Sequence, residues 1–223
     1  MELLYTAHVP PGDGPFPCVL ALHGFGASAH DLIGLAPIIH GGGAIMLCPQ
    51  GPLAFQIAEG VLGFAWATPP SEPGGDPGLG EYEEAAAKVR RFLDRAVERY
   101  PIDPRKIVTL GFSQGGVVGY DLVLRDPGRF AGLVALSSWL PDPLDASIPS
   151  QPEHDAYPAL VIHGTEDPMI PVQRGQESRE ALMKRGINVH YREYEMGHEI
   201  RPEALRDLVT WLEEKIFTVI QLV

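Results

Sequence analysis

A serine set between glycines is the feature of this sequence that points most clearly to chemistry. Gly111-Phe112-Ser113-Gln114-Gly115 has the pattern Gly-x-Ser-x-Gly, and it separates an apolar, β-branched run at 107–110 from a segment that can be helical. In such a strand-to-helix turn the serine stands at the tip, and small residues two positions away on either side let the two backbones pass closely. We therefore predict that Ser113 is a nucleophile and does not merely cap the helix.

A serine hydroxyl reacts at neutral pH only when a base takes its proton. In this kind of turn the partners follow along the chain in the order serine, acid, histidine. Asp167 lies just past the apolar run at 159–162, and His198 lies just before the last helical segment. We predict that His198 is the general base for Ser113 and that Asp167 orients the imidazole and stabilises its protonated form.

Two other residues compete for these roles. Glu166 is the alternative acid, but Pro168 turns the chain directly after Asp167, which favours Asp167. His163 is the alternative base, but no acid precedes it at a strand end, and we expect its ring to lie within or against the sheet. The remaining histidines either do not follow the serine and the acid along the chain or do not lie in a loop after a strand.

The tetrahedral oxyanion of an acyl transfer requires preorganised donors, each of which lowers the barrier by about 3 kcal/mol in comparable sites. One predicted donor is the backbone N–H of Gln114 at the start of the helix. The other is a backbone N–H of the loop 23–26, most plausibly that of Phe25. We interpret His23 as a structural residue that braces this loop.

Apolar side chains near these loops are candidates for the walls that hold the acyl group. For each of them ordinary core packing is the alternative interpretation. The candidates are Phe25, Phe64, Trp66, Met169 and Ile170, together with Leu53 and Phe55.

Composition excludes several classes of protein. The chain has 223 residues and a net charge of −12, which opposes binding to nucleic acid and to anionic membranes. No stretch is apolar enough to span a bilayer, and the start lacks the features of a signal peptide. Cys18 and Cys48 lie in apolar runs, so we expect two free buried thiols and a cytoplasmic protein. Neither metal-ligand spacing nor a nucleotide fingerprint occurs, so we expect no metal and no cofactor.

Strands that alternate with helices predict an α/β fold with a mostly parallel sheet covered on both faces, in one domain over 1–223. The spacing favours an antiparallel pair of strands at 3–9 and 18–22, and a helix capped by Ser28 that runs to Ile38. The stretch 51–80 shows no periodicity and is expected to be irregular, with part of it packed down. The apolar tail 218–223 has two readings, a strand added to a partner or a segment docked on its own domain.

Four segments resemble one known family. They are Leu22-His23-Gly24-Phe25-Gly26, Gly111-Phe112-Ser113-Gln114-Gly115-Gly116, the segment from His163 to Pro168 with Pro171-Val172, and Gly197-His198. Together they resemble the small carboxylesterase, lysophospholipase and acyl-protein thioesterase family of α/β-hydrolases over about 19–217. The resemblance implies catalytic Ser113, Asp167 and His198, oxyanion donors on Phe25 and Gln114, and no cofactor. Where the family often has an aromatic residue and Asp after a Trp, this chain has Ala67-Thr68-Pro69 after Trp66. The short interval between 136 and 159 leaves no room for a large cap domain.

The resulting hypothesis is a serine carboxylesterase that hydrolyses short- to medium-chain esters through an acyl-enzyme. Two alternatives share this mechanism but differ in substrate: a thioesterase that acts on acylated protein, and a lysophospholipase. A third alternative is a non-catalytic binding protein with the same fold. The complete set of catalytic groups disfavours it. The expected partner is a small ester or thioester, and a homodimer stays open.

Overall fold

The computed structural model describes residues 3–69 and 78–218. Its strands are β1 Tyr5–His8, β2 Phe16–Leu22, β3 Ile45–Pro49, β4 Leu53–Ala58, β5 Val61–Ala65, β6 Ile102–Phe112, β7 Gly132–Leu136, β8 Pro158–Gly164 and β9 Asn188–Tyr194. Its α-helices are α1 Leu79–Arg99, α2 Gln114–Arg125, α3 Asp142–Ser147, α4 Val172–Lys184 and α5 Pro202–Leu212.

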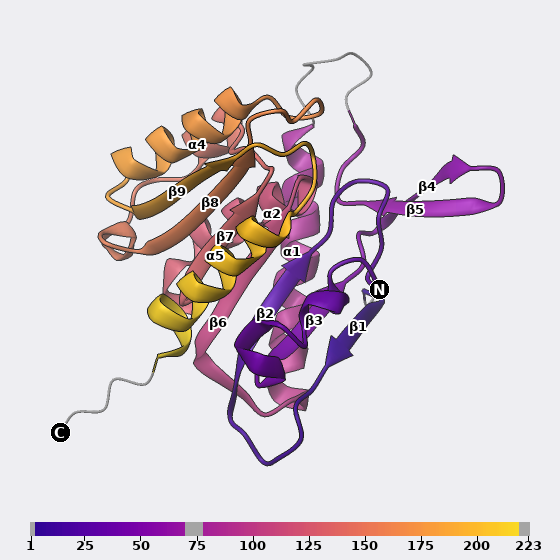
Figure 1. The fold of residues 1–223 in the computed structure, drawn as a ribbon, viewed down its shortest axis with the longest axis vertical. Coiled ribbons are helices and arrows are strands. Elements are labelled where there is room, and N and C mark those ends of the chain that lie inside the picture. The colour runs from indigo at the N-terminus through magenta and orange to yellow at the C-terminus, as the bar shows by residue number, and fades with distance from the viewer. Residues whose placement is uncertain (1–2, 70–77, 219–223) are drawn as a thin grey trace.

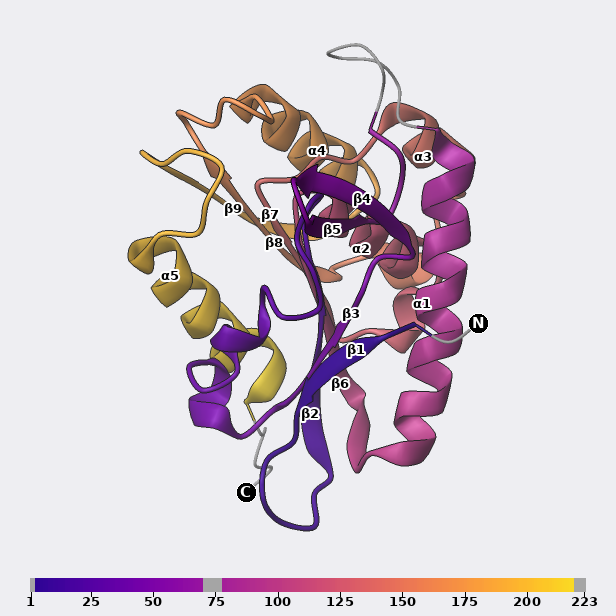
Figure 2. The ribbon, with the colours of Figure 1, turned by 90° about the vertical axis from the view of Figure 1, so that its right-hand side faces the viewer.

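Seven strands form one sheet in the order β1-β3-β2-β6-β7-β8-β9, in which only β1 runs antiparallel to its neighbour. The central strands are almost wholly buried and carry continuous apolar runs, as expected for parallel strands covered on both faces. Helices α1, α2 and α4 pack on one face, and α5 packs on the other (Figures 1 and 2). This is the predicted α/β-hydrolase architecture, and within the described residues no separate cap domain covers the sheet.

The amphipathic pattern of α1 explains why it forms and how it docks. Its buried positions step by three or four residues and include Tyr82, Val89 and Leu93. Pro101 follows the helix closely and cannot continue it. The helix therefore covers the face of the sheet near β1 and β2, opposite α5 (Figure 2).

The structure corrects the predicted pairing of the first two strands. β1 pairs with β3, while β2 lies between β3 and β6. The apolar run of β2 suits an interior position, because both faces of an interior parallel strand are covered. Proximity along the chain was therefore a poor guide to pairing.

The predicted helix from Ser28 to Ile38 was also wrong. Two 3₁₀ turns, Ile33–Leu35 and Ile39–Gly42, take its place. Gly34 and Pro37 both disfavour an α-helix there, Gly34 through backbone entropy and Pro37 through its missing N–H.

The stretch 51–69 contains a hairpin that the sequence analysis did not predict. β4 and β5 pair as a separate two-stranded antiparallel sheet, joined at Glu59-Gly60, and Gly60 has a φ of +72°. A short connection with glycine in the left-handed region is typical of a hairpin. The hairpin projects from the body of the molecule (Figure 1). The remainder of the predicted irregular stretch, 70–77, and the tail beyond 218 lie outside the described residues.

Candidate active site

Ser113 occupies a strained turn between β6 and α2. Its φ of 53° and ψ of −122° are rare for a residue with a side chain. Its backbone N–H donates to the Leu136 carbonyl at 2.9 Å, which ties the turn to β7. A Cβ on Gly115 would overlap with the carbonyl oxygen of Leu22, and one on Gly111 would overlap with that of Gly115. The glycines of the motif therefore permit the close approach that holds the serine in place.

Asp167 and His198 lie together beyond β8 and β9. His198 Nδ1 and Asp167 Oδ2 are 2.8 Å apart, which leaves His198 Nε2 free to accept a proton. The other carboxylate oxygen of Asp167 accepts the backbone N–H groups of Met169 and Ile170, each at 2.9 Å. The Asp167 side chain is buried, so these bonds fix its orientation.

His163 supports this loop from within the sheet. Its Nε2–H donates to the Ile170 carbonyl at 2.9 Å and lies 3.7 Å from Asp167 Oδ2. Burial lowers the pKa of His163, so the ring is neutral at physiological pH. The expectation that this ring lies within or against the sheet is confirmed. Because the His163 ring is buried and donates to the Ile170 carbonyl, it stabilises the loop that carries Asp167.

The ring of Phe112 places the imidazole of His198 beside the serine turn. The two ring centroids are 4.8 Å apart with an interplanar angle of 50°, and Phe112 directly precedes Ser113. Among the described residues no hydrogen bond joins Ser113 Oγ to His198. In structures without substrate such bonds are often long, and they tighten when substrate binds.

Two backbone N–H groups in the segments around the serine turn have no hydrogen-bond acceptor among the described residues. They belong to Gln114, the first residue of α2, and to Phe25. A Cβ on Gly24 would lie 3.3 Å from the Cβ of Ser113, so the loop that carries Phe25 contacts the serine turn. Two unused donors beside a serine hydroxyl have the chemistry of an oxyanion hole.

A chain of hydrogen bonds ties the Phe25 loop to α2. The Gly26 N–H donates to the Phe64 carbonyl at 2.9 Å, which joins the loop to β5. Trp66 donates its Nε1–H to the His23 carbonyl at 2.8 Å and its backbone N–H to Gln114 Oε1 at 3.1 Å. The Gln114 side chain thus links the segment after β5 to the start of α2.

The structural role predicted for His23 fits its contacts. Its Nδ1–H donates to the Gly24 carbonyl at 2.7 Å, and its Nε2 accepts the Gly51 N–H at 2.9 Å. Burial lowers the pKa of His23, in agreement with a neutral ring that uses both nitrogens.

The candidate wall residues differ in exposure. Trp66 is only 1% exposed, so the prediction that it contacts substrate is corrected: it packs in the core and braces the loop. Phe25 and Met169 are exposed, and Phe64 and Ile170 are half-buried. Phe25 lies 5.5 Å from Phe55 between ring centroids, so the hairpin extends the apolar surface beside the loop. Phe25, Phe64, Met169 and Ile170 stay predictions as walls.

A cavity on the His198 side was missed at the sequence level. It has a volume of about 320 Å³, and its lining is apolar except for one carboxylate. The lining residues are Asp31, Leu32, Gly34, Leu35, Phe112 and Ile200. Phe112 belongs to the Gly-x-Ser-x-Gly motif, and its position next to Ser113 could have indicated that its side chain lines the site. Asp31, Leu32, Gly34 and Leu35 lie in the segment predicted to be an α-helix, so their place in the cavity was not foreseen, and Ile200 carried no signal.

Ser138 is a further supporting residue without a sequence signal. Its Oγ–H donates to the Ser113 carbonyl at 2.8 Å, and a Cβ on Gly116 would overlap with this hydroxyl. The bond crosses from the end of β7 to the serine turn, so only the fold brings these residues together.

The described residues provide neither a metal-ligand group nor a membrane-spanning helix. No group of three His, Cys, Asp or Glu side chains there could hold a metal ion. No helix in this part of the chain is long and apolar enough to cross a membrane.

The sheet order, the strained serine turn after β6 and the acid–histidine pair beyond β8 and β9 define an α/β-hydrolase. The comparison with family models gives a narrower assignment. The chain belongs to the phospholipase/carboxylesterase family, whose model matches residues 6–216.

Individual proteins support this assignment. Acyl-protein thioesterase 1 of Gibberella zeae is 34% identical over 119 residues, which are 52% of this chain and 50% of that protein. Carboxylesterase SOBER1 of Arabidopsis thaliana is 29% identical over 136 residues, 60% of this chain and 58% of its own length. The matched segments thus span only about half of these curated relatives. The crystal structure of esterase PE8 superposes with a TM-score of 0.79 at 25% identity, covering 96% of this chain and 100% of that chain.

Proposed function

We propose that this chain is a serine carboxylesterase that hydrolyses short- to medium-chain carboxylic esters, with Ser113, His198 and Asp167 as its catalytic residues. The observation that carries the proposal is the 2.8 Å bond from Asp167 to a histidine whose ring packs beside the strained Ser113 turn. The backbone N–H groups of Gln114 and Phe25, which have no acceptor among the described residues, add support as donors to the oxyanion.

The mechanism follows from these positions. His198 Nε2 takes the proton of Ser113 as Oγ attacks the acyl carbon, while Asp167 stabilises the imidazolium. The N–H groups of Phe25 and Gln114 bind the oxyanion. The tetrahedral intermediate collapses, His198 protonates the leaving alkoxide, and an acyl-serine remains. His198 then takes a proton from water as the water oxygen attacks the acyl carbon. The second tetrahedral intermediate collapses with cleavage of the bond between the acyl carbon and Oγ, His198 returns the proton to Ser113 Oγ, and the acid departs.

The substrate should be largely apolar near the scissile bond. The cavity of about 320 Å³ beside Phe112 accepts an apolar group, and Phe25, Phe64, Met169 and Ile170 are proposed to form the opposite walls. The reaction needs neither metal nor cofactor, and buried free thiols at Cys18 and Cys48 agree with a cytoplasmic location.

A thioesterase that acts on acylated protein is the second candidate. It uses the same groups, and one of the similar proteins is named acyl-protein thioesterase 1. A matched pair of an octanoyl ester and an octanoyl thioester, compared by kcat/KM, separates the two activities.

The experiment that tests the proposal measures hydrolysis of p-nitrophenyl acetate, butyrate and octanoate by wild type and Ser113→Ala. We expect kcat to fall by roughly three orders of magnitude or more in the variant. Ser150→Ala is the matched control, because it removes the hydroxyl of an exposed serine in the loop after α3, outside the candidate site. Equal rates for wild type and Ser113→Ala would eliminate the mechanism.

A further inference from the structure

The cavity beside Phe112 contains a charge that the proposed mechanism does not use. The side chains of Leu32, Leu35 and Ile200 line it, and Asp31 is the charged residue among its lining residues. Asp31 is exposed, and its carboxylate has no hydrogen bond or ion pair among the residues that the structure describes. The volume of about 320 Å³ far exceeds the roughly 30 Å³ of one water molecule in the liquid. The cavity therefore has room for a branched organic group beside an unpaired carboxylate.

The segment that carries Asp31 is held by its own turns and packing. The Asp31 backbone N–H donates to the Ser28 carbonyl at 3.1 Å, and the 3₁₀ turn Ile33–Leu35 begins two residues later. Leu32, which lies between them, is buried. A Cβ placed on Gly34 would meet no atom within 4 Å, so the space beside this turn is open. The carboxylate thus has a defined place at an accessible cavity.

The cavity lies on the side of the site where the alcohol part of an ester would leave. In the proposed mechanism His198 protonates the leaving alkoxide, so the alcohol part must begin beside the His198 ring. The ring of Phe112 packs against that imidazole with 4.8 Å between centroids, and it also lines the cavity. Ile200, two residues after His198, is another lining residue. The lining residues include none from the loop that carries Phe25, so the acyl group is directed elsewhere.

The carboxylate decides which kind of alcohol part suits this cavity. A neutral apolar group would take water from the Asp31 carboxylate without replacing it, which costs free energy. A quaternary ammonium group offsets this cost through its charge, and its methyl groups bury apolar surface against Leu35 and Ile200. An aromatic ring such as that of Phe112 also attracts such a cation. We propose, on the basis of the proposed esterase function, that this cavity binds the quaternary ammonium group of esters whose alcohol part is an alkylated amino alcohol.

Other cations fit the cavity less well. Ca²⁺ takes about six to eight oxygen ligands, and no group of three His, Cys, Asp or Glu side chains in the described part of the chain could hold a metal ion. A primary ammonium group has N–H donors to satisfy, whereas Asp31 is the lining residue whose side chain accepts hydrogen bonds. A quaternary ammonium group has no N–H donor. One carboxylate in apolar surroundings therefore meets its needs.

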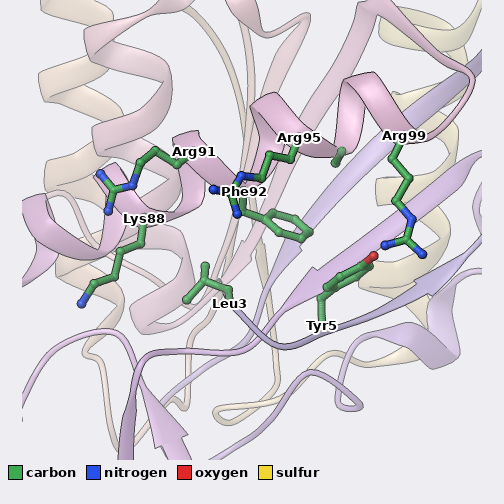
Figure 3. Close-up of a pocket in the computed structure, with 8 residues that line it drawn as sticks. Leu3, Tyr5, Lys88, Arg91, Phe92, Arg95 and Arg99 are labelled. Carbon is green, nitrogen blue, oxygen red and sulfur yellow. The ribbon is translucent and has the colours of Figure 1, made fainter. Parts of the chain in front are cut away.

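The surrounding charges also favour a cation at this place. Arg201, which follows the lining residue Ile200, pairs with Glu199 at 2.8 Å and is not itself a lining residue. The net charge of −12 attracts cationic substrates from solution. A cavity lined by residues of β1 and α1 has the opposite character, because Arg91 and Arg99 are among its lining residues (Figure 3). The cavity beside Phe112 is therefore a selective place for a cation on this acidic protein.

The test compares two esters of the same shape, butyrylcholine and 3,3-dimethylbutyl butyrate, in which a carbon atom replaces the charged nitrogen. Both release butyric acid, so titration at constant pH measures both rates. We expect kcat/KM of wild type to be roughly five- to tenfold higher for butyrylcholine. In Asp31→Asn this ratio should fall to about twofold or less. The preference should also shrink as ionic strength rises, because salt screens the exposed carboxylate.

Asp13→Asn is the matched control. It removes the same charge from an exposed loop before β2, at the opposite end of that strand from the loop that carries Phe25. The ratio of the two kcat/KM values in Asp13→Asn should equal that of wild type. The pair of variants therefore separates a local contact with Asp31 from the general effect of an acidic protein.

A binding measurement keeps this inference separate from the proposed esterase activity. Ser113→Ala should broaden the N-methyl resonance of choline in an NMR titration, and Ser113→Ala/Asp31→Asn should broaden it much less. The neutral alcohol 3,3-dimethylbutan-1-ol should show little broadening with either protein. Hydrolysis of the neutral ester without binding of choline would overturn this inference and leave the esterase proposal standing. Binding of choline through Asp31 in a wild-type protein that hydrolyses neither ester would overturn the esterase proposal and the substrate assigned here.

Three kinetic outcomes would also contradict the proposal. The first is equal kcat/KM of wild type for the two esters. The second is an equal fractional loss for both esters in Asp31→Asn, which would show that Asp31 acts on His198 or on the fold. The third is the same fall in the ratio for Asp13→Asn as for Asp31→Asn, which would assign the preference to the overall charge.

Discussion

The two halves of the candidate site are built in different ways. The half that carries Ser113 is local: one short motif provides the strand end, the turn and the helix start, and glycines allow the close contacts. The half that carries Phe25 is assembled from distant segments, because the loop after β2 is bonded to β5 and, through Trp66, to Gln114. A local motif leaves a signature in the sequence, whereas a network of long-range bonds does not. Substitutions in the two halves should therefore lower activity to different extents.

The largest expected effect is on the local half. Gly115→Ala would force a methyl group into the carbonyl oxygen of Leu22, and neither backbone can give way without moving the serine. We expect kcat to fall at least about 100-fold, because small misplacements of a nucleophile are costly. The measurement is p-nitrophenyl butyrate hydrolysis together with the urea midpoint.

Gly119→Ala is the matched control on the same helix. Its added methyl group would first meet Leu133 at 3.6 Å, an ordinary contact. Activity should be unchanged and stability equal or higher. If Gly119→Ala lost as much activity as Gly115→Ala, the effect would reflect a general intolerance of α2 to substitution. The contrast between the two halves of the site would then be wrong.

The assembled half should respond more gradually. Trp66→Phe keeps the ring in the core but removes the Nε1–H donor, so the buried His23 carbonyl loses its partner. We expect kcat to fall about tenfold with little change in KM, since the proposed oxyanion donor of Phe25 would shift while substrate contacts remain. Stability should fall by about 1–3 kcal/mol.

Trp211→Phe is the corresponding control, because Trp211 is buried on α5 away from this network. It should lower stability without a selective loss of kcat. If Trp66→Phe and Trp211→Phe had the same kcat, the bracing role of Trp66 would be wrong.

The cavity beside Phe112 can sharpen the comparison, because it adjoins the half that carries Ser113 and none of its lining residues belongs to the Phe25 loop or to β5. Nothing lies within 4 Å of a Cβ placed on Gly34, so Gly34→Trp can fill the cavity without disturbing the core. We expect kcat/KM to fall roughly tenfold for the bulkiest esters and little for p-nitrophenyl acetate. Gly34→Ala should match wild type on both. A uniform loss across substrates would show that the cavity does not hold part of the ester.

The smallest effect concerns the brace behind Asp167. Burial lowers the pKa of His163 in the folded state, so the unfolded chain binds its proton more readily. Unfolding then takes up a proton as pH falls below the ordinary histidine pKa of about 6.5, and stability is lost on the acid side. Thermal unfolding should show a decline in Tm from pH 7 to pH 5 that is shallower in His163→Gln. Parallel declines in the two proteins would contradict this role.

The sequence predicted the fold class and most helices, because apolar periodicity and long buried runs report burial directly. It failed where pairing depended on tertiary context: β1 joined β3, Pro37 and Gly34 prevented a helix, and the hairpin at 53–65 had no strong alternation. In the candidate site, the serine motif and the order of Asp167 and His198 were readable. The burial of Trp66 and the contacts of Phe112 and Ser138 were not, since they arise from segments that only the fold brings together.

The central claim, that Ser113 is a nucleophile made reactive by His198 and Asp167, is tested most directly by covalent labelling. A fluorophosphonate probe should form one adduct on wild type, and peptide mass spectrometry should locate it on Ser113. The labelling rate should fall at least about 100-fold in His198→Ala. An adduct on another residue, or an unmodified Ser113 in protein that still hydrolyses esters, would contradict the account.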